Sequence, residues 1–237
     1  MNGDFRHGFR DARVTLGWVW PVTSAVAALL AVAAIGVLEA QAIGSPSRGR
    51  NNQLHLLQGV AFGLVVPLFA IALSTRLGGR LDELMRVAWA RYGGDRRSYA
   101  LGRQTWPMLL LSVTGALAGA LALGLGRAST DPRLELPLNV ASLWAVLGIA
   151  GLAALCYVAC LGLATLYAGS LGRALFVLAD WLLGSGQSAL ALPFPRSHVR
   201  SLLGGSPVLG MNELQAALCL VALTLACTLL YARRVPR

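Results

Sequence analysis

The chain has 237 residues, of which 56% are hydrophobic and only 13% are charged, about half the charged fraction of a typical soluble domain. Its formal net charge of +10 comes from arginine alone, and the absence of lysine excludes a Walker A nucleotide loop and a Schiff-base mechanism. The arginines stand at the ends of apolar runs and form no basic face with interleaved aromatic residues, so we expect membrane lipids, and no nucleic acid, as partners.

Six apolar runs follow one another along the chain. Each is close to the ~20 residues that an α-helix needs to cross the hydrocarbon core of a bilayer. The sequence therefore predicts an all-α fold, a polytopic transmembrane helix bundle of about six spans, with residues 1–237 forming a single transmembrane domain. The predicted spans are approximately 17–38, 55–75, 106–126, 138–167, 174–192 and 214–232.

The division between the fourth and fifth runs is the least marked. From Val140 to Leu183 the only charged residues are Arg173 and Asp180. We place a tight turn at Arg173, because Gly169 and Gly172 flank it and arginine prefers the membrane interface. If this turn is misplaced, a count of five or seven spans follows.

The distribution of arginine predicts the orientation in the membrane. With six spans, both termini lie on one side, and that side holds most of the 20 arginines. Cytoplasmic loops of membrane proteins carry an excess of basic residues. We therefore expect both termini in the cytoplasm and the protein in the bacterial inner membrane.

The longest predicted cytoplasmic loop, 76–105, carries a helical apolar stripe. The stripe falls at positions i, i+3, i+4, i+7 and i+8, and charged residues such as Glu83 fall on the other side. We expect a short amphipathic helix between spans two and three, which either lies on the bilayer or docks on a partner. The stripe residues are Leu81, Leu84, Met85, Ala88 and Trp89.

The end of this loop carries a resemblance to a known family. Asp95-Arg96-Arg97 is followed by Tyr99-Ala100-Leu101-Gly102-Arg103. In this the chain resembles the ABC type-2 exporter permeases, in which an acidic coupling helix is followed by a Ser-Arg-Arg-like element and an aromatic–aliphatic–Gly–basic entry to the next span. Here Asp95 replaces the small hydroxyl residue and Arg103 replaces a lysine.

Two later segments extend the resemblance over nearly the whole chain. The segment from Leu161 to Arg173 looks like the family's short turn between spans four and five. The stretch from Pro193 to Pro207 lies where the family has external re-entrant helices before its last span.

The resemblance implies the membrane-spanning permease subunit of an ATP-driven exporter. Such a subunit forms the translocation path with a second permease copy or a homologous permease, and a separate ABC ATPase subunit hydrolyses ATP. The chain itself is then not an enzyme. The ATPase-coupling residues that the resemblance implies are Leu81, Glu83, Leu84, Met85, Trp89, Arg96, Arg97 and Arg173.

The remaining residues offer little chemistry of their own. No catalytic motif is present, and the sequence predicts no catalytic residue, no metal and no cofactor. Cys156 and Cys160 are four residues apart, which permits a soft-metal site, but no His or Met accompanies them and apolar packing is favoured. Asp180 is a carboxylate inside an apolar run, either part of a pathway or proton relay, or a helix-end residue paired with an arginine such as Arg173. The second interpretation is favoured.

Two other functions remain open from the residues alone. One is a non-catalytic membrane scaffold or assembly subunit, with the 76–103 loop as its interaction surface. The other is an intramembrane enzyme acting on lipid, for which Asp180 and His198 are the candidates.

Overall fold

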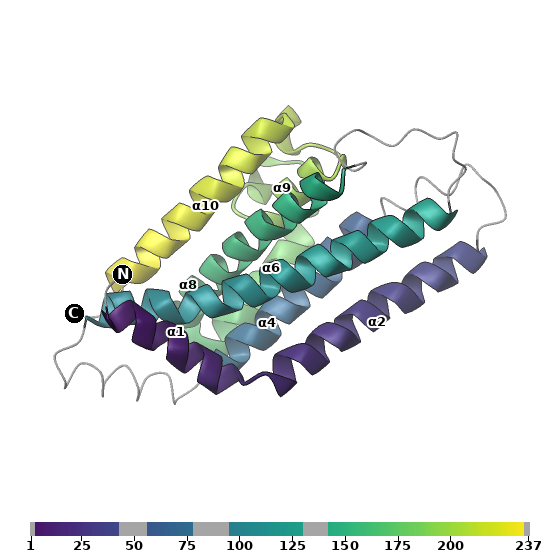
Figure 1. The fold of residues 1–237 in the computed structure, drawn as a ribbon. Helices are drawn as coiled ribbons and strands as arrows, with labels where there is room; N and C mark the ends of the chain where they lie inside the picture. Colours follow the sequence, from purple (N-terminus) through teal and green to yellow (C-terminus); the bar gives the residue numbers. More distant parts are fainter. Residues whose placement is uncertain (1–2, 43–55, 78–94, 130–141, 235–237) are drawn as a thin grey trace.

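The computed structural model describes residues 3–42, 56–77, 95–129 and 142–234 (Figure 1). Within these ranges every regular element is a helix and no strand occurs, which confirms the all-α class. The elements are α1 (Gly3–Leu16), α2 (Val19–Ala42), the π-helix η1 (Leu56–Val65), α4 (Val66–Leu77), α6 (Arg96–Ser129), α8 (Leu143–Leu183), the short η2 (Ala189–Ala191), α9 (Pro195–Leu202), the short η3 (Val208–Gly210) and α10 (Glu213–Arg234).

Five of the described helical segments are long and apolar enough to cross a membrane. They are α2, the continuous pair η1–α4, α6, α8 and α10. This agrees with the predicted transmembrane bundle. The helix α6 begins at Arg96, well before the predicted start of the third span at 106, because Asp95 caps its first turn.

The long helix α8 is folded in two. Ala168 and Gly169 leave the helical conformation, with φ −140° and +57° respectively. The hydroxyl of Tyr157, which precedes them, and the carboxylate of Asp180, which follows them, are 2.7 Å apart. An unbroken helix would separate these two residues by roughly 35 Å. The chain therefore reverses at Ala168–Gly169, and the arms 143–167 and 170–183 correspond to the predicted spans four and five.

The reversal corrects two details of the prediction. The turn lies at Ala168–Gly169 and not at Arg173, because Gly169 adopts φ +57° and ψ −132°, a conformation open essentially to glycine. Arg173 is helical. The second arm ends at Leu183 and not at 192, so its 14 residues span only about 21 Å, less than the ~30 Å of a hydrocarbon core.

Different helical elements come together at the two ends of the bundle. At the first, here called the α1 end, α1 lies beside the start of α6 and the end of α4, and the reversal of α8 is bonded to that same end of α4 (Figure 1). At the other, here called the α9 end, η1 and the short elements η2, α9 and η3 come together.

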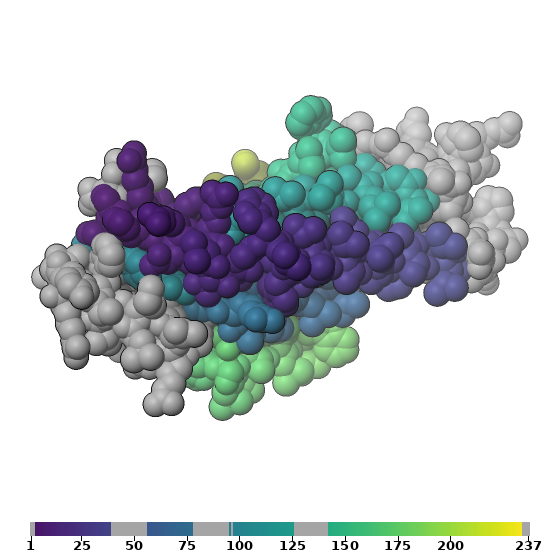
Figure 2. All heavy atoms as spheres, turned by 60° about the horizontal axis from the view of Figure 1, so that its bottom comes forward, coloured from purple at the N-terminus to yellow at the C-terminus, as the bar shows by residue number. Residues whose placement is uncertain are grey.

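Burial separates inner from outer helices. The apolar windows of η1–α4 and α8 are 67% and 61% buried, whereas those of α2 and α10 are each 17% buried. In Figure 2, α1 and α2 run across one face of the molecule. The two outer helices therefore leave most of their apolar surface for lipid or for another polypeptide.

Candidate functional site

The predicted coupling helix falls between two described helices. Leu81, Glu83, Leu84, Met85 and Trp89 lie outside the described residues. The structure gives both flanks of their loop: α4 ends at Leu77, and α6 follows Asp95.

Asp95 caps the first turn of α6. Its carboxylate accepts hydrogen bonds from the Arg97 N–H (3.1 Å), the Ser98 N–H (3.3 Å) and the Ser98 hydroxyl (2.6 Å). These bonds hold the pKa of Asp95 below its ordinary value because they favour the charged form, and the bond from the Ser98 hydroxyl has the largest effect. Arg96 and Arg97, which the resemblance places among the ATPase-coupling residues, are the first two residues of α6.

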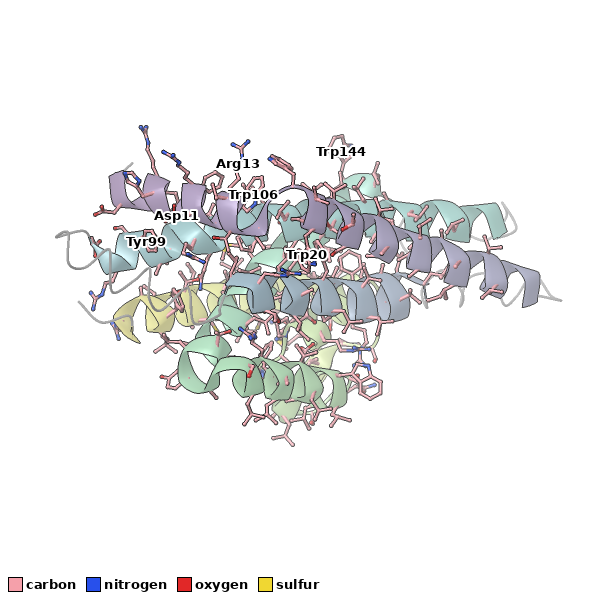
Figure 3. The ribbon with its side chains drawn as sticks, turned by 90° about the horizontal axis from the view of Figure 1, so that it is seen from below. Asp11, Arg13, Trp20, Tyr99, Trp106 and Trp144 are labelled. Atoms are coloured by element: carbon pink, nitrogen blue, oxygen red, sulfur yellow. The ribbon has the colours of Figure 1, made fainter. Side chains whose placement is uncertain are left out.

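The N-terminal helix α1 is docked on this same turn. Asp4 accepts the Asp95 N–H at 2.9 Å, and Asp11 accepts the Tyr99 hydroxyl at 2.6 Å (Figure 3). The backbones touch where Gly8 crosses the first turn of α6: a Cβ on Gly8 would overlap the carbonyl oxygen of Tyr99. The start of α6 is thus held by two carboxylates from α1.

Sequence reasoning missed α1 as an element. It treated these residues only as an arginine-bearing start to the first span. The available signal was weak: Gly8, Ala12 and Leu16, four residues apart, are the buried positions of α1, and two of them are too small to register as an apolar stripe.

Two buried arginines bind the last turn of α4. Arg173, only 5% exposed, donates from Nη1 to the Ser74 carbonyl at 3.2 Å, and Arg103 donates from Nη2 to the Leu77 carbonyl at 3.3 Å. The final carbonyls of a helix lack intrahelical partners and favour cations. The reversal of α8 and the entry of α6 therefore meet at the end of α4, and Arg173 lies inside the bundle and not on its surface.

Asp180 joins the two arms of α8 to α9. It is 1% exposed, and it accepts the Tyr157 hydroxyl at 2.7 Å and the Arg196 backbone N–H at 3.1 Å. Since Arg196 is the second residue of α9, the carboxylate caps the N-terminus of that helix from another element. The partners of Asp180 are therefore Tyr157 and Arg196, not the predicted Arg173.

A small cavity with a mostly apolar lining lies at the α1 end between α4, α6, α8 and α10. Its volume of about 70 Å³ is enough for a few water molecules and too small for an organic cargo. The buried amide of Gln104, which has no hydrogen-bond partner in the described structure, lies in its wall. The cavity is suited to bound water that satisfies this amide.

The cysteines pack between helices. The Cys160 sulfur lies 3.5 Å from that of Cys227 on α10, a contact that the sequence does not reveal, and Cys156 is buried. Within the described ranges, no group of three or more His, Cys, Asp or Glu side chains is arranged to hold a metal ion. The contact fits the packing interpretation of these thiols.

No protein-family model matches the chain, and no curated protein matches it either. A function is therefore proposed from the chain's own residues, from their arrangement and from the resemblance that its sequence carries.

Proposed function

We propose that the chain is the membrane-spanning permease subunit of an ATP-driven ABC exporter and that a separate ATPase subunit docks at the α1 end. One observation carries the proposal. The two elements expected to face the ATPase, the 78–94 loop and the 168–173 turn, both connect to the last turn of α4, through Leu77 and through the Arg173–Ser74 bond. A single docked partner can reach both elements.

The two helices that flank the loop are bonded to other helices, so they could transmit a movement of the loop to the bundle. On one side the loop continues from α4. Arg173 bonds α8 to the end of α4, and Arg103 bonds α6 to it. On the other side it enters α6 through the capped turn at Asp95, held by α1. A displacement of the loop by the ATPase would then act on α4, α6 and α8 together.

The two departures from the family pattern keep the chemistry of the residues they replace. Serine and aspartate are both preferred N-caps, because each accepts hydrogen bonds from the first free N–H groups of a helix. Asp95 does this at the start of α6. Arg103 retains the positive charge of the lysine that it replaces and reaches the Leu77 carbonyl.

The translocation path would lie between two permeases. The described cavities within one copy are small, and the poorly buried α2 and α10 offer apolar surface to a second copy or a homologous permease. ATP binding would close the ATPase pair and rock the spans between inward and outward states. This proposal places the protein in the bacterial inner membrane, with both termini and the α1 end in the cytoplasm.

Co-purification tests the proposal. A tagged chain extracted in mild detergent is expected to recover an ABC ATPase, and Glu83→Arg with Trp89→Ala is expected to reduce that recovery and the transport activity. The matched control applies the same two changes at the α9 end, Glu213→Arg with Trp144→Ala, where both side chains are exposed.

If no ATPase is recovered and the Glu83→Arg/Trp89→Ala variant keeps full function, the proposal fails. Recovery of a membrane complex without an ATPase would instead favour the alternative, a non-catalytic scaffold or assembly subunit.

A further inference from the structure

A second pocket lies at the α9 end, between η1 and α9. Its volume is about 200 Å³. Its lining residues belong to η1, to α9 and to the segment just after α8, far from the proposed ATPase contact, so nothing in the exporter proposal makes use of it. Its lining residues are Gln58, Gly59, Phe62, Ser185, Arg196, Val199 and Arg200.

Two guanidinium groups dominate the chemistry of this pocket. Arg196 and Arg200 are four residues apart on α9, so their side chains leave the same face of the helix, and both are only partly exposed. None of the described lining residues is a carboxylate. Like charges this close repel each other, and the neighbouring Arg196 adds to the effect of burial in lowering the pKa of Arg200.

The hydrogen-bond partners of these guanidinium groups in the described structure are neutral. Arg200 donates to the carbonyls of Ser185, Gly186 (3.0 Å) and Ser206 (3.4 Å), while its buried Nε–H has no partner in the described structure. Arg196 donates from Nη1 to the Gly63 carbonyl at 2.7 Å. Carbonyl groups satisfy N–H donors but leave both positive charges in place.

Among the residues that the structure describes, Asp180 is a carboxylate bonded to α9, and it does not neutralise the pocket. Asp180 is not part of the lining, and its two oxygens accept the Tyr157 hydroxyl and the Arg196 backbone N–H. Even if it is fully charged, one carboxylate stands against two guanidinium groups.

The opposite wall of the pocket is a π-helix. Such helices have i→i+5 hydrogen bonds and are rare, usually no longer than a single turn. They are frequent at functional sites. Here η1 extends over ten residues. It brings the Gly63 carbonyl to Arg196, and a Cβ on Gly63 would lie only 3.0 Å from the Arg196 Nη2 atom. The absence of a side chain at Gly63 therefore lets the Arg196 guanidinium group approach the η1 backbone closely.

We propose that this pocket binds a phosphoryl group between Arg196 and Arg200. Guanidinium groups recognise phosphate oxygens through charge-assisted hydrogen bonds. Carbonyls take only one of the five guanidinium N–H groups of Arg196, so Arg196 can donate to a phosphate oxygen, while Arg200, with three N–H groups on carbonyls, contributes chiefly its positive charge. Gln58 and Ser185 supply further polar groups, and Phe62 and Val199 supply apolar walls. The phosphoryl group comes either from the headgroup of an anionic lipid or from a soluble phosphate. The inference does not depend on the exporter proposal.

Thermal unfolding of the purified full chain tests the site and distinguishes the two sources. One arm compares inorganic phosphate with chloride at equal ionic strength, in a neutral maltoside detergent. The other compares nanodiscs of phosphatidylcholine with and without phosphatidylglycerol. A rise in Tm in the first arm identifies a soluble phosphate, and a rise in the second arm alone identifies a lipid headgroup.

The variant Arg196→Gln/Arg200→Gln is expected to lose this rise in Tm. The matched control Arg10→Gln/Arg233→Gln removes two exposed arginines from α1 and α10 and is expected to keep it. An equal rise in the double variant and in the wild type would overturn the proposal.

A footprinting measurement on the wild-type chain keeps the test independent of mutation, since Arg200 also holds the Ser185 and Gly186 carbonyls. Phosphate or phosphatidylglycerol is expected to slow the modification of Arg196 and Arg200 by phenylglyoxal at least several-fold and to leave Arg10 and Arg233 unchanged. Rates at Arg196 and Arg200 that neither anion alters would overturn the proposal.

Discussion

The hydroxyl of Tyr157 donates a 2.7 Å hydrogen bond to the carboxylate of Asp180, which lies 23 residues further along α8. The bond joins the two arms of the hairpin that reverses at Ala168–Gly169. Because the second oxygen of Asp180 caps α9 through Arg196, one buried carboxylate holds three elements together. This makes Asp180 a structural residue of the α9 end.

Removal of either partner should destabilise the bundle, and the two losses should not add. Tyr157→Phe leaves Asp180 with one partner fewer, and Asp180→Ala removes the acceptor for both donors. We expect about 1–3 kcal/mol for each and a double variant less destabilised than the sum, as for residues in direct contact. A double-mutant cycle from chemical unfolding in detergent measures the coupling. Strict additivity would contradict the assigned bond.

The conformation of Gly169 should make it intolerant of any side chain. An alanine at φ +57° and ψ −132° is strained, so Gly169→Ala should destabilise the chain by about 1–3 kcal/mol. The control is Gly151→Ala in the first arm of α8, where a Cβ meets nothing within 4 Å and the helical position should gain up to about 1 kcal/mol. Opposite signs of the change in unfolding free energy are expected. Equal effects would argue against the reversal at Gly169.

Asp95 should contribute through its hydrogen-bond acceptors. We expect Asp95→Ala to cost about 0.5–2 kcal/mol and Asp95→Ser to restore most of the loss, because serine is also a good N-cap. Thermal unfolding of the three proteins measures this order. Equal stability of the alanine and serine variants would contradict the cap.

The capping by Asp95 should also depend on pH. Its folded-state pKa lies below the ordinary value of 3.8, so the stability from its charge is present above that value and is lost as the pH falls through the lowered pKa. The stability difference between wild type and Asp95→Ser should therefore shrink below about pH 4. A difference independent of pH would mean that the charge is not involved.

The contact between α1 and α6 should fail when Gly8 gains a side chain. Gly8→Leu would push α1 from the Tyr99 carbonyl and favour local unfolding of α1 around the trypsin sites at Arg10 and Arg13, so limited proteolysis there should be faster. The control is Gly3→Leu, since a Cβ at Gly3 meets nothing within 4 Å. Equal cleavage rates in both variants would show that the contact does not hold α1.

Much of the fold could be predicted from the sequence, because membrane spans are defined by length and apolarity, which are local properties. The hairpin in α8 could also be predicted, but its position could not. The sequence predicts the turn at Arg173, yet the structure places Arg173 within a helix, where it is buried against the Ser74 carbonyl. Only the backbone angles single out Gly169, because the sequence has several glycines in this segment and does not show which of them adopts a positive φ.

The sites were less predictable than the fold. The partners of Asp180 come from 23 residues before it and 16 after it, so no local spacing reveals them. The pocket of Arg196 and Arg200 likewise depends on η1, more than 130 residues away, whose π-helical geometry leaves no clear sequence signal. The coupling surface that the family resemblance implies stays a prediction, whereas the buried contacts needed the three-dimensional arrangement.

Site-specific photo-crosslinking tests the proposed docking of an ATPase at the α1 end most directly. Benzoylphenylalanine would replace the exposed Leu171, beside the reversal of α8, or the equally exposed Leu190 in η2 at the α9 end. In intact cells we expect a crosslinked product that contains an ABC ATPase from position 171 and none from position 190. An absence of ATPase crosslinks from position 171, or their appearance at position 190, would contradict the account.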